Sequence, residues 1–390
     1  MTAVWNVVEG LKPAILMVAV QIAFTALNVM YMLAVDDGMS LRVAVAYRFI
    51  FATAFIAPLA LVLERNKRPK MTWTVLFQAS LCGLFGGLTQ NFYLESLALT
   101  SATFVTAMAN LTPAVTFILA VFFRLERLNL KTAAGKAKMI GTIIGIIGAM
   151  IITFFKGIEI TGFFHITLLH PHKRHAASPH SSSGSNILLG SLCALASCLA
   201  YALWLITQTK MSKSYPCHYS STALMSFMAS LLCTVVALCL EKDWTQWKLG
   251  SKVRLLTTTY SGIVISGAMV VVLTWCMHMR GPLYVSAFNP LLLLFVVICG
   301  FFMLNEKLHL GSVIGGVLIV CGLYVFLWGK DKEIKKMNQQ RVSSSENLHE
   351  EIKVGSPAED KHSPHNNNCE VQVVVSDRDH SSQNASEAVV

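Results

Sequence analysis

A few polar side chains lie inside long apolar stretches of this sequence, and these are the residues that could do chemistry there. Arg48 is the clearest case, because it follows Leu41 by seven residues in a stretch that stays apolar as far as Leu63. An ionised side chain at membrane depth is costly unless it is paired or hydrated, so it is a functional candidate by default. A guanidinium in this setting can bind a carboxylate of the protein or of a small anionic solute.

Amide side chains accompany Arg48 at similar depth. On a helical rise of about 1.5 Å per residue, Arg48 lies roughly 10 Å inside its stretch, and Asn28 and Asn91 come within a few ångströms of that depth. Gln90 precedes Asn91, and Glu95 lies nearer the outer end of the same stretch. An ion pair between Arg48 and Glu95 is geometrically feasible. The pattern fits a structural bridge and fits equally a role for Arg48 in substrate binding or gating.

Two Asn and Pro combinations interrupt later apolar stretches. Asn110 precedes Pro113, and Asn289 directly precedes Pro290. Proline inside a helix frees a carbonyl, which water, a side chain or a ligand must then satisfy. We expect kinks here that shape a cavity, the alternative being bends that serve packing alone. The residues predicted to line the solute pathway are Gln21, Asn28, Arg48, Gln90, Asn91, Glu95, Asn110, Pro113, Trp204, Asn289 and Pro290.

The remaining polar residues indicate no catalytic centre. Gln208, His278 and Arg280 lie near the ends of apolar stretches, where we expect them to snorkel to the interface. The sequence contains no pairing of a nucleophile with a base, no paired carboxylates at matched depth and no metal-ligand spacing. We therefore predict no enzymatic activity, no cofactor and no metal site.

Long apolar helices must position these residues. The chain is 54% hydrophobic and only 13% charged, too apolar for one or two soluble domains. Ten stretches of about 18 to 25 mainly apolar residues are each long enough to cross a hydrocarbon core of about 30 Å. They are residues 13–35, 41–63, 73–98, 101–123, 137–155, 187–209, 221–240, 257–278, 283–303 and 311–328. The predicted fold class is an all-α integral membrane protein with ten transmembrane helices.

The distribution of cations predicts the orientation. One set of alternate loops holds 17 Lys and Arg residues and the opposite set holds 9. The richer side faces the cytosol in most membrane proteins, so we expect both termini there. Because the net charge of +10 comes from short loops beside helix ends, it does not indicate nucleic-acid binding.

The chain divides into two related halves. Residues 11–155 form the first, a polar His- and Ser-rich loop covers 156–186, the second half covers 187–328, and residues 329–390 form a polar tail that we expect to be disordered. The motif at 104–107 recurs at 284–287, and the motif at 141–145 recurs at 311–315. Five crossings per half is an odd number, so the second copy enters from the opposite face and the repeat is inverted.

Several strings in these halves resemble a known family. They are NLTPAVTFI at 110–118, FRLER at 123–127, AKMIGT at 137–142, GPLYVSAFNP at 281–290, NEKL at 305–308 and GSVIG at 311–315. This set is similar to the plant nodulin-21-like, walls-are-thin-related transporters, also described as usually-multiple-acids-move-in-and-out transporters. The family belongs to the drug/metabolite transporter superfamily and carries two EamA-type repeats. Asn305 stands where many relatives have Asp, but Glu306 is retained.

The resemblance covers residues 11–330 and implies a five-plus-five inverted repeat that moves amino acids, auxin or related metabolites. We therefore expect a secondary transporter or facilitator of small organic solutes, most plausibly amino acids or auxin-like organic acids, working by alternating access in a plant membrane. The alternatives are a nucleotide-sugar or metabolite antiporter of the same superfamily and, less favoured, a receptor or channel. A doubly charged phosphate would call for more than one intramembrane cation, and only Arg48 clearly qualifies.

The expected partners are a small organic solute and the lipid bilayer, without nucleic acid, and a homo-oligomer is left open. The plasma membrane is favoured over the vacuolar membrane.

Overall fold

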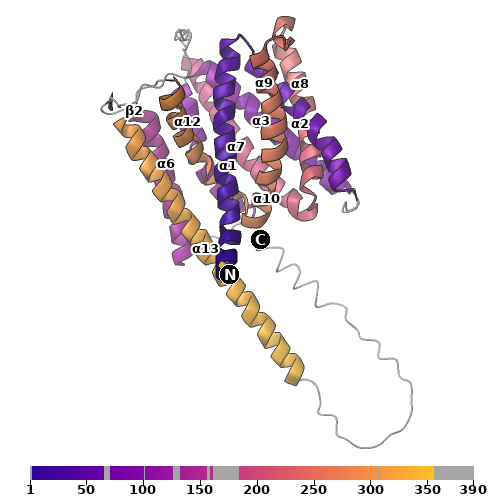
Figure 1. The fold of residues 1–390 in the computed structure, drawn as a ribbon, viewed down its shortest axis with the longest axis vertical. Coiled ribbons are helices and arrows are strands. Elements are labelled where there is room, and N and C mark those ends of the chain that lie inside the picture. Colours follow the sequence, from indigo (N-terminus) through magenta and orange to yellow (C-terminus); the bar gives the residue numbers. More distant parts are fainter. Residues whose placement is uncertain are drawn as a thin grey trace, which may run out of the picture.

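The computed structural model describes residues 2–65, 71–100, 102–125, 132–155, 159–160, 184–304 and 308–354. They form a bundle of long helices with one small strand pair at one end (Figure 1). In the first half the helices are α1 (Thr2–Asp36), α2 (Leu41–Leu63), α3 (Trp73–Leu99), α4 (Ala102–Ala109), α5 (Thr112–Phe122) and α6 (Ala133–Phe154).

The second half contains α7 (Gly184–Ser214), α8 (His218–Leu240), the 3-10 helix η1 (Trp244–Trp247), α9 (Lys252–Thr259), the π-helix η2 (Tyr260–Met269), α10 (Val270–Arg280), α11 (Pro282–Ser286), α12 (Asn289–Leu304) and α13 (Leu310–Val354). Strand β1 (Glu159–Ile160) pairs antiparallel with β2 (Leu308–His309).

Local signals set several helix boundaries. The Thr72 hydroxyl accepts the Val75 N–H at 3.4 Å at the start of α3, and the Thr132 hydroxyl accepts the Gly135 N–H at 3.2 Å at the start of α6. Such N-caps satisfy backbone donors that have no partner inside the helix. Gly281 has a φ of +87°, a conformation that other residues rarely adopt, and it forms the turn between α10 and α11.

Nine segments of the described residues are long and apolar enough to cross a membrane. They are 11–36, 41–63, 104–122, 133–154, 187–214, 218–240, 252–280, 282–301 and 310–337. Nine of the ten predicted stretches correspond to these segments. The tenth, predicted at 73–98, is helix α3, whose Gln78, Gln90, Asn91 and Glu95 make it more polar than the others.

The bundle has two ends, which we name after Ser40 and Glu64. α1 begins and α13 leaves the bundle at the Glu64 end (Figure 1). α1 runs antiparallel to the segment α9–η2–α10, since the Thr257 hydroxyl donates to Met30 O and the Cys276 thiol contacts Pro13 O. α3 runs antiparallel to α7 in the same way. The two halves are therefore interleaved rather than packed as separate domains.

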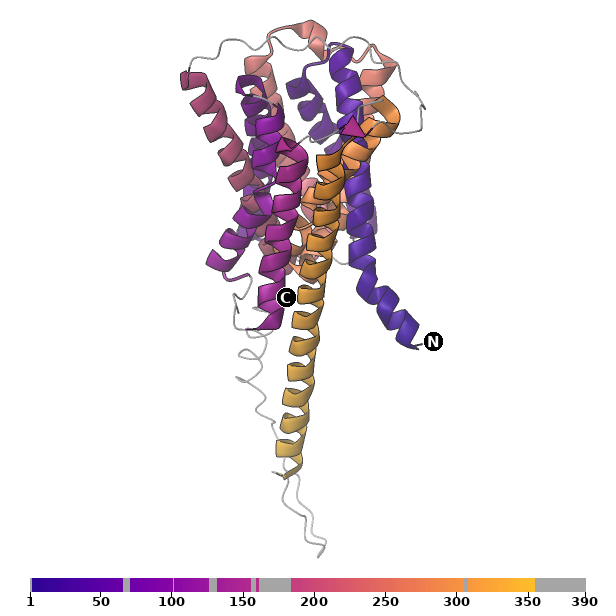
Figure 2. The ribbon, with the colours of Figure 1, turned by 90° about the vertical axis from the view of Figure 1, so that its left-hand side faces the viewer.

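Glycines allow α6 and α13 to pack in close contact, as Figure 2 shows. A Cβ atom added at Gly322 would lie 2.6 Å from Gly145 N and 2.7 Å from Gly141 O, so no other residue fits without displacement. The small-xxx-small spacing of the sequence thus acts in helix packing.

The structure differs from the prediction of disorder after residue 328. α13 stays helical to Val354, and residues 355–390 lie outside the described part. Ion pairs support the added turns: Lys335 Nζ lies 2.7 Å from Asp331 Oδ2, and Lys138 Nζ on α6 lies 2.8 Å from Glu333 Oε2. Of the predicted loop 156–186, only β1 and the first residues of α7 are described.

Candidate functional site

Arg48 is buried in the contact between α2 and the π-helix η2. Arg48 is only 6% exposed, and its Nε donates to Ser266 Oγ at 2.5 Å. The guanidinium carbon lies 5.7 Å from the ring centroid of Phe49 and 6.0 Å from that of Phe24. No carboxylate among the described residues forms an ion pair with Arg48. The cation is thus held by one hydroxyl and two aromatic faces.

A glycine makes this contact close enough for the hydrogen bond. A Cβ atom added at Gly262 would collide with Phe51 Cβ and lie 2.9 Å from Arg48 O, so a side chain there would push η2 away from α2. Ser266 lies one turn further along η2. π-Helical segments are rare and occur often at functional sites. Ser266 was not predicted as a site residue, because a single serine in an apolar stretch carries no distinctive signal.

The ion pair between Arg48 and Glu95, which the depth estimate allowed, does not form. Glu95 instead accepts from Arg42, whose Nη2 lies 2.7 Å from Glu95 Oε2, and the two side chains are 30% and 41% exposed. Arg42 stands in the first turn of α2, at the Ser40 end, where α3 brings Glu95. Arg48 is more than one helical turn deeper. Arg42 is one of the nine cations counted on the poorer side in the charge comparison, and it was not predicted as a partner of Glu95.

The amide side chains predicted at the depth of Arg48 have different surroundings. The Asn91 side-chain N–H group donates to Gly87 O at 2.9 Å and contacts Cys233 Sγ on α8 at 3.6 Å. Cys233 packs with Phe49 of α2 in one buried cluster. Asn91 thus meets the helix that also packs against α2. Gln21 on α1 is buried, whereas Asn28 and Gln90 are half-buried.

Both predicted Asn and Pro sites lie at breaks between helices. Asn110 and Leu111 separate α4 from α5, and Ala287 and Phe288 separate α11 from α12. Asn110 is 5% exposed, and its side-chain nitrogen has no hydrogen-bond partner among the described residues. Asn289 begins α12, and its side chain lies close to Tyr201 of α7.

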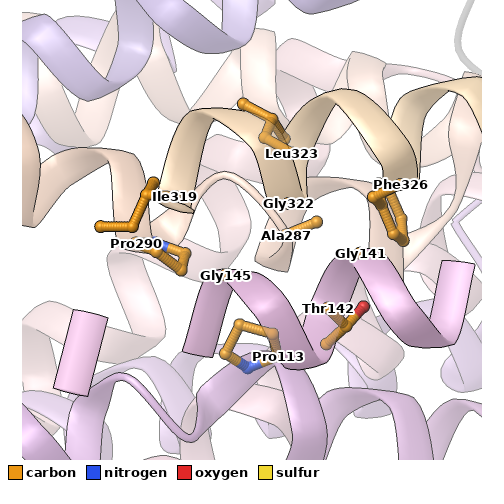
Figure 3. Close-up of a pocket in the computed structure, with 10 residues that line it drawn as sticks. All are labelled: Pro113, Gly141, Thr142, Gly145, Ala287, Pro290, Ile319, Gly322, Leu323 and Phe326. Carbon is orange, nitrogen blue, oxygen red and sulfur yellow. The ribbon is translucent and has the colours of Figure 1, made fainter. Parts of the chain in front are cut away.

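One small pocket joins these breaks (Figure 3). It lies between Pro113 of α5 and Pro290 of α12, and it has room for about one water molecule. Its lining consists of Pro113, Gly141, Thr142, Gly145, Ala287, Pro290, Ile319, Gly322, Leu323 and Phe326. The structure therefore brings the two prolines together, from opposite halves of the chain, in a pocket too small for an organic solute.

Trp204 is buried on α7, apart from the residues that line this pocket. Its indole N–H donates to Met225 Sδ at 3.0 Å, and its ring lies 5.6 Å from that of Tyr201. Tyr201 therefore connects Trp204 to Asn289. Sequence reasoning missed Tyr201, although its position three residues before Trp204 places it on the same helix face.

The expectation that Gln208 snorkels is wrong. Gln208 is fully buried on α7, and its side-chain N–H donates to the Thr274 hydroxyl of α10 at 3.0 Å. α7 continues to Ser214, beyond the predicted end at residue 209, so Gln208 lies deeper than the sequence indicates. His278 and Arg280 are half-buried near the Glu64 end.

The interleaved helices, the buried cation and the broken helix pairs belong to a multi-pass helical membrane protein. Comparison with known proteins shows its class, a transporter and not an enzyme: residues 12–154 and 188–328 match the model of the EamA-like transporter family. Two WAT1-related proteins of Arabidopsis thaliana are similar to the chain. One is 43% identical over 328 residues, covering 83% of this chain and 91% of the relative. The other is 42% identical over 332 residues, covering 84% and 92%.

The chain belongs to the WAT1-related, nodulin-21-like branch of the EamA-like transporters, in the drug/metabolite transporter superfamily. A solved crystal structure shares the fold with a TM-score of 0.57 at 15% identity, covering 81% of this chain and 96% of the other. The resemblance read from the sequence motifs is confirmed.

Proposed function

We propose that the chain is a secondary carrier of small organic solutes, with ten crossings in a five-plus-five inverted repeat. α3 supplies the tenth crossing, because its 27 residues extend about 40 Å and it packs along α7 and α8, which are both candidate spans.

Helix contacts support the inversion. α1 packs on α12 as α7 packs on α5, and α2 packs on η2 as α8 packs on α3. Since α1 and α7 start at opposite ends of the bundle, equivalent helices of the two halves run in opposite directions.

Arg48 is the observation that carries the proposal of an organic-acid or amino-acid substrate. A guanidinium buried without a carboxylate partner among the described residues offers the donors that a solute carboxylate needs. The proposed pathway extends from Arg48 to Asn110 and Asn289, where a broken helix exposes backbone groups. Arg48 is the only buried arginine among the described residues, which favours a monocarboxylate or zwitterion over the nucleotide sugars of the alternative antiporter.

Both ends of the bundle are closed by contacts, which supports alternating access. At the Ser40 end the Ser40 hydroxyl donates to Glu241 Oε2 at 2.6 Å, and Arg254 Nε lies 2.9 Å from Asp37 Oδ2. At the other end Glu64 accepts the first backbone N–H groups of α8, at 3.0 and 2.7 Å. Each set joins the two halves. Transport requires these contacts to open in turn, because the pocket between the broken helices holds about one water.

The charge distribution supports a cytosolic Glu64 end, with both chain termini on that side, because Lys and Arg are richer in its loops. We place the carrier in the plasma membrane in preference to the vacuolar membrane, and this is open to test by fluorescence of a tagged chain.

Counterflow in proteoliposomes tests the carrier function directly. Vesicles with the purified chain are loaded with unlabelled glutamine, glutamate or indole-3-acetate and diluted into the labelled solute. A carrier gives saturable, transient accumulation of label that depends on the internal unlabelled solute. A receptor gives no flux, and a channel gives flux that internal solute does not stimulate; either result contradicts the proposal.

A further inference from the structure

Polar side chains form a column along three packed helices, from the Glu64 end toward Arg48. Within each helix the members are four residues apart, so they occupy one face. We call this set the polar column: Gln208 and Ser212 on α7, His218, Thr222 and Ser226 on α8, and Thr274 and His278 on α10. Ser266, the partner of Arg48, lies two four-residue steps before Thr274 on the same segment, so the column points toward the proposed solute site.

Two histidines contact the same hydroxyl at the Glu64 end of the column. Ser212 Oγ lies 3.3 Å from His278 Nδ1 and 3.4 Å from His218 Nδ1, and the two imidazole centroids are 5.6 Å apart. A hydroxyl has a single hydrogen and can donate to only one of the two nitrogens. The other nitrogen must carry a hydrogen to complete the second contact. The arrangement therefore suits a proton shared between two imidazoles.

The next levels of the column are fully buried and lack partners. Thr274 accepts from Gln208 at 3.0 Å, but Gln208 Oε1, Thr222 Oγ1 and Ser226 Oγ have no hydrogen-bond partner among the described residues. Thr222 and Ser226 are both 0% exposed. Buried polar atoms of this kind require water or a ligand, since apolar surroundings offer nothing else. Water bound by these hydroxyls and this amide would extend a proton path beyond the two histidines.

The charged groups around the two imidazoles favour the binding of one proton by the pair rather than two. Glu64, at the end of α2, accepts the backbone N–H groups of Tyr219 and Ser220, directly after His218, and Lys213 of α7 directly follows Ser212, whose hydroxyl lies between the imidazoles. Arg280 follows His278 by two residues on α10, and Val75 of α3 packs in one cluster with Cys217, the residue before His218. An acid on one side and a cation on the other therefore favour a single shared proton.

We propose that the polar column binds and conducts the proton that couples solute movement to a pH gradient, with His218 and His278 as the proton-binding groups. A hydronium ion at the Glu64 end transfers a proton to one imidazole nitrogen, so that an O–H bond breaks, an N–H bond forms and a water molecule is left. Ser212 relays it: its oxygen takes the hydrogen from one Nδ1 as its own hydrogen passes to the other. Release to water in the column completes the transfer. This inference rests on the carrier function proposed above.

The test compares two assays on the same proteoliposomes. Counterflow of labelled glutamine or glutamate measures carrier function without a pH gradient. Accumulation of the same solutes across a gradient of one pH unit, with the membrane potential clamped, measures coupling. Indole-3-acetate is unsuitable here, because its neutral form crosses lipid down a pH gradient unaided. At one proton per solute, wild-type chain should accumulate label roughly tenfold.

The variants are His218→Gln, His278→Gln, the double variant and Ser212→Ala, with His309→Gln as the matched control. His309 lies on β2 at the Ser40 end, whereas the two histidines of the column lie near the Glu64 end (Figure 1). We expect the double variant to keep counterflow and lose gradient-driven accumulation, with the control unchanged. Undiminished accumulation in the double variant overturns the proposal, as does wild-type counterflow without accumulation. Loss of counterflow in all four column variants, with normal membrane insertion, also overturns it by assigning the column a structural role. Absence of counterflow in the wild-type chain refutes the carrier function itself.

Discussion

Replacement of Arg48 by glutamine should separate acidic solutes from their uncharged analogues. Glutamine keeps a polar side chain beside Ser266 but removes the positive charge. A hydrogen bond to a charged group contributes about 1.5 to 3 kcal/mol. If Arg48 binds the solute carboxylate, its loss should weaken apparent affinity for acids by roughly 10- to 150-fold. Affinity for the corresponding amides, such as indole-3-acetamide, should change much less.

Arg42→Gln is the matched control, because it removes the same charge from the same helix. Arg42 pairs with Glu95 at 2.7 Å, and both side chains are about a third exposed (30% and 41%). An exposed ion pair contributes about 0.2 to 1 kcal/mol, so this variant should change affinity at most about fivefold for acids and amides alike.

The assay is competition by unlabelled acids and amides against a labelled solute in proteoliposomes of each variant. A double-mutant cycle adds a structural check: Arg42 should show coupling to Glu95 in stability, and Arg48 should show none. Equal affinity ratios of acid to amide in wild type and Arg48→Gln would refute the binding role. Arg48 would then serve only to hold η2 against α2.

Three further predictions address packing, the extended helix and orientation. Gly322→Ala should lower the free energy of unfolding by about 1 to 3 kcal/mol, because the added Cβ would overlap α6. Gly145→Ala is the control and should be nearly neutral, because nothing lies within 4 Å of its added Cβ. Thermal unfolding in detergent measures both. Glu333→Gln should destabilise by about 1 to 3 kcal/mol, because buried Lys138 now donates to two carboxylate oxygens and would keep at most one neutral acceptor there. An unchanged melting temperature would contradict this. Asn384, in the sequon Asn-Ala-Ser, should stay free of glycan if the tail is cytosolic, and a mobility shift on glycosidase treatment would overturn the orientation.

Much of the fold could be read from the sequence. Hydropathy located the helices to within a few residues in most cases. An apolar segment in lipid must satisfy its backbone N–H and C=O groups by its own hydrogen bonds, and a helix does so. The motifs identified the transporter family, which the comparisons confirm. Kinks near Pro113 and Pro290 were predicted from proline chemistry, and the structure has full breaks between helices at these sites.

The sequence did not predict correctly which polar side chains contact one another. The depth estimate allowed Arg48 to reach Glu95, yet Glu95 bonds to Arg42, because two cations on one helix compete and a shift of one turn decides between them. Gln208 looked interfacial only because the end of α7 was placed too early. Disorder after residue 328 was inferred from composition, which is blind to the bond from Glu333 to a buried lysine on another helix.

The sequence by itself determined the class of protein, the helices and the polar residue types inside them, because hydropathy, proline chemistry and charge bias act locally along the chain. Only the tertiary structure decided which polar groups meet. The contact of Arg48 with Ser266 depends on a π-helix and on the close approach at Gly262, and the meeting of His218 with His278 depends on how α8 and α10 cross. Such contacts join residues far apart in the chain, and their geometry follows from the packing of whole helices.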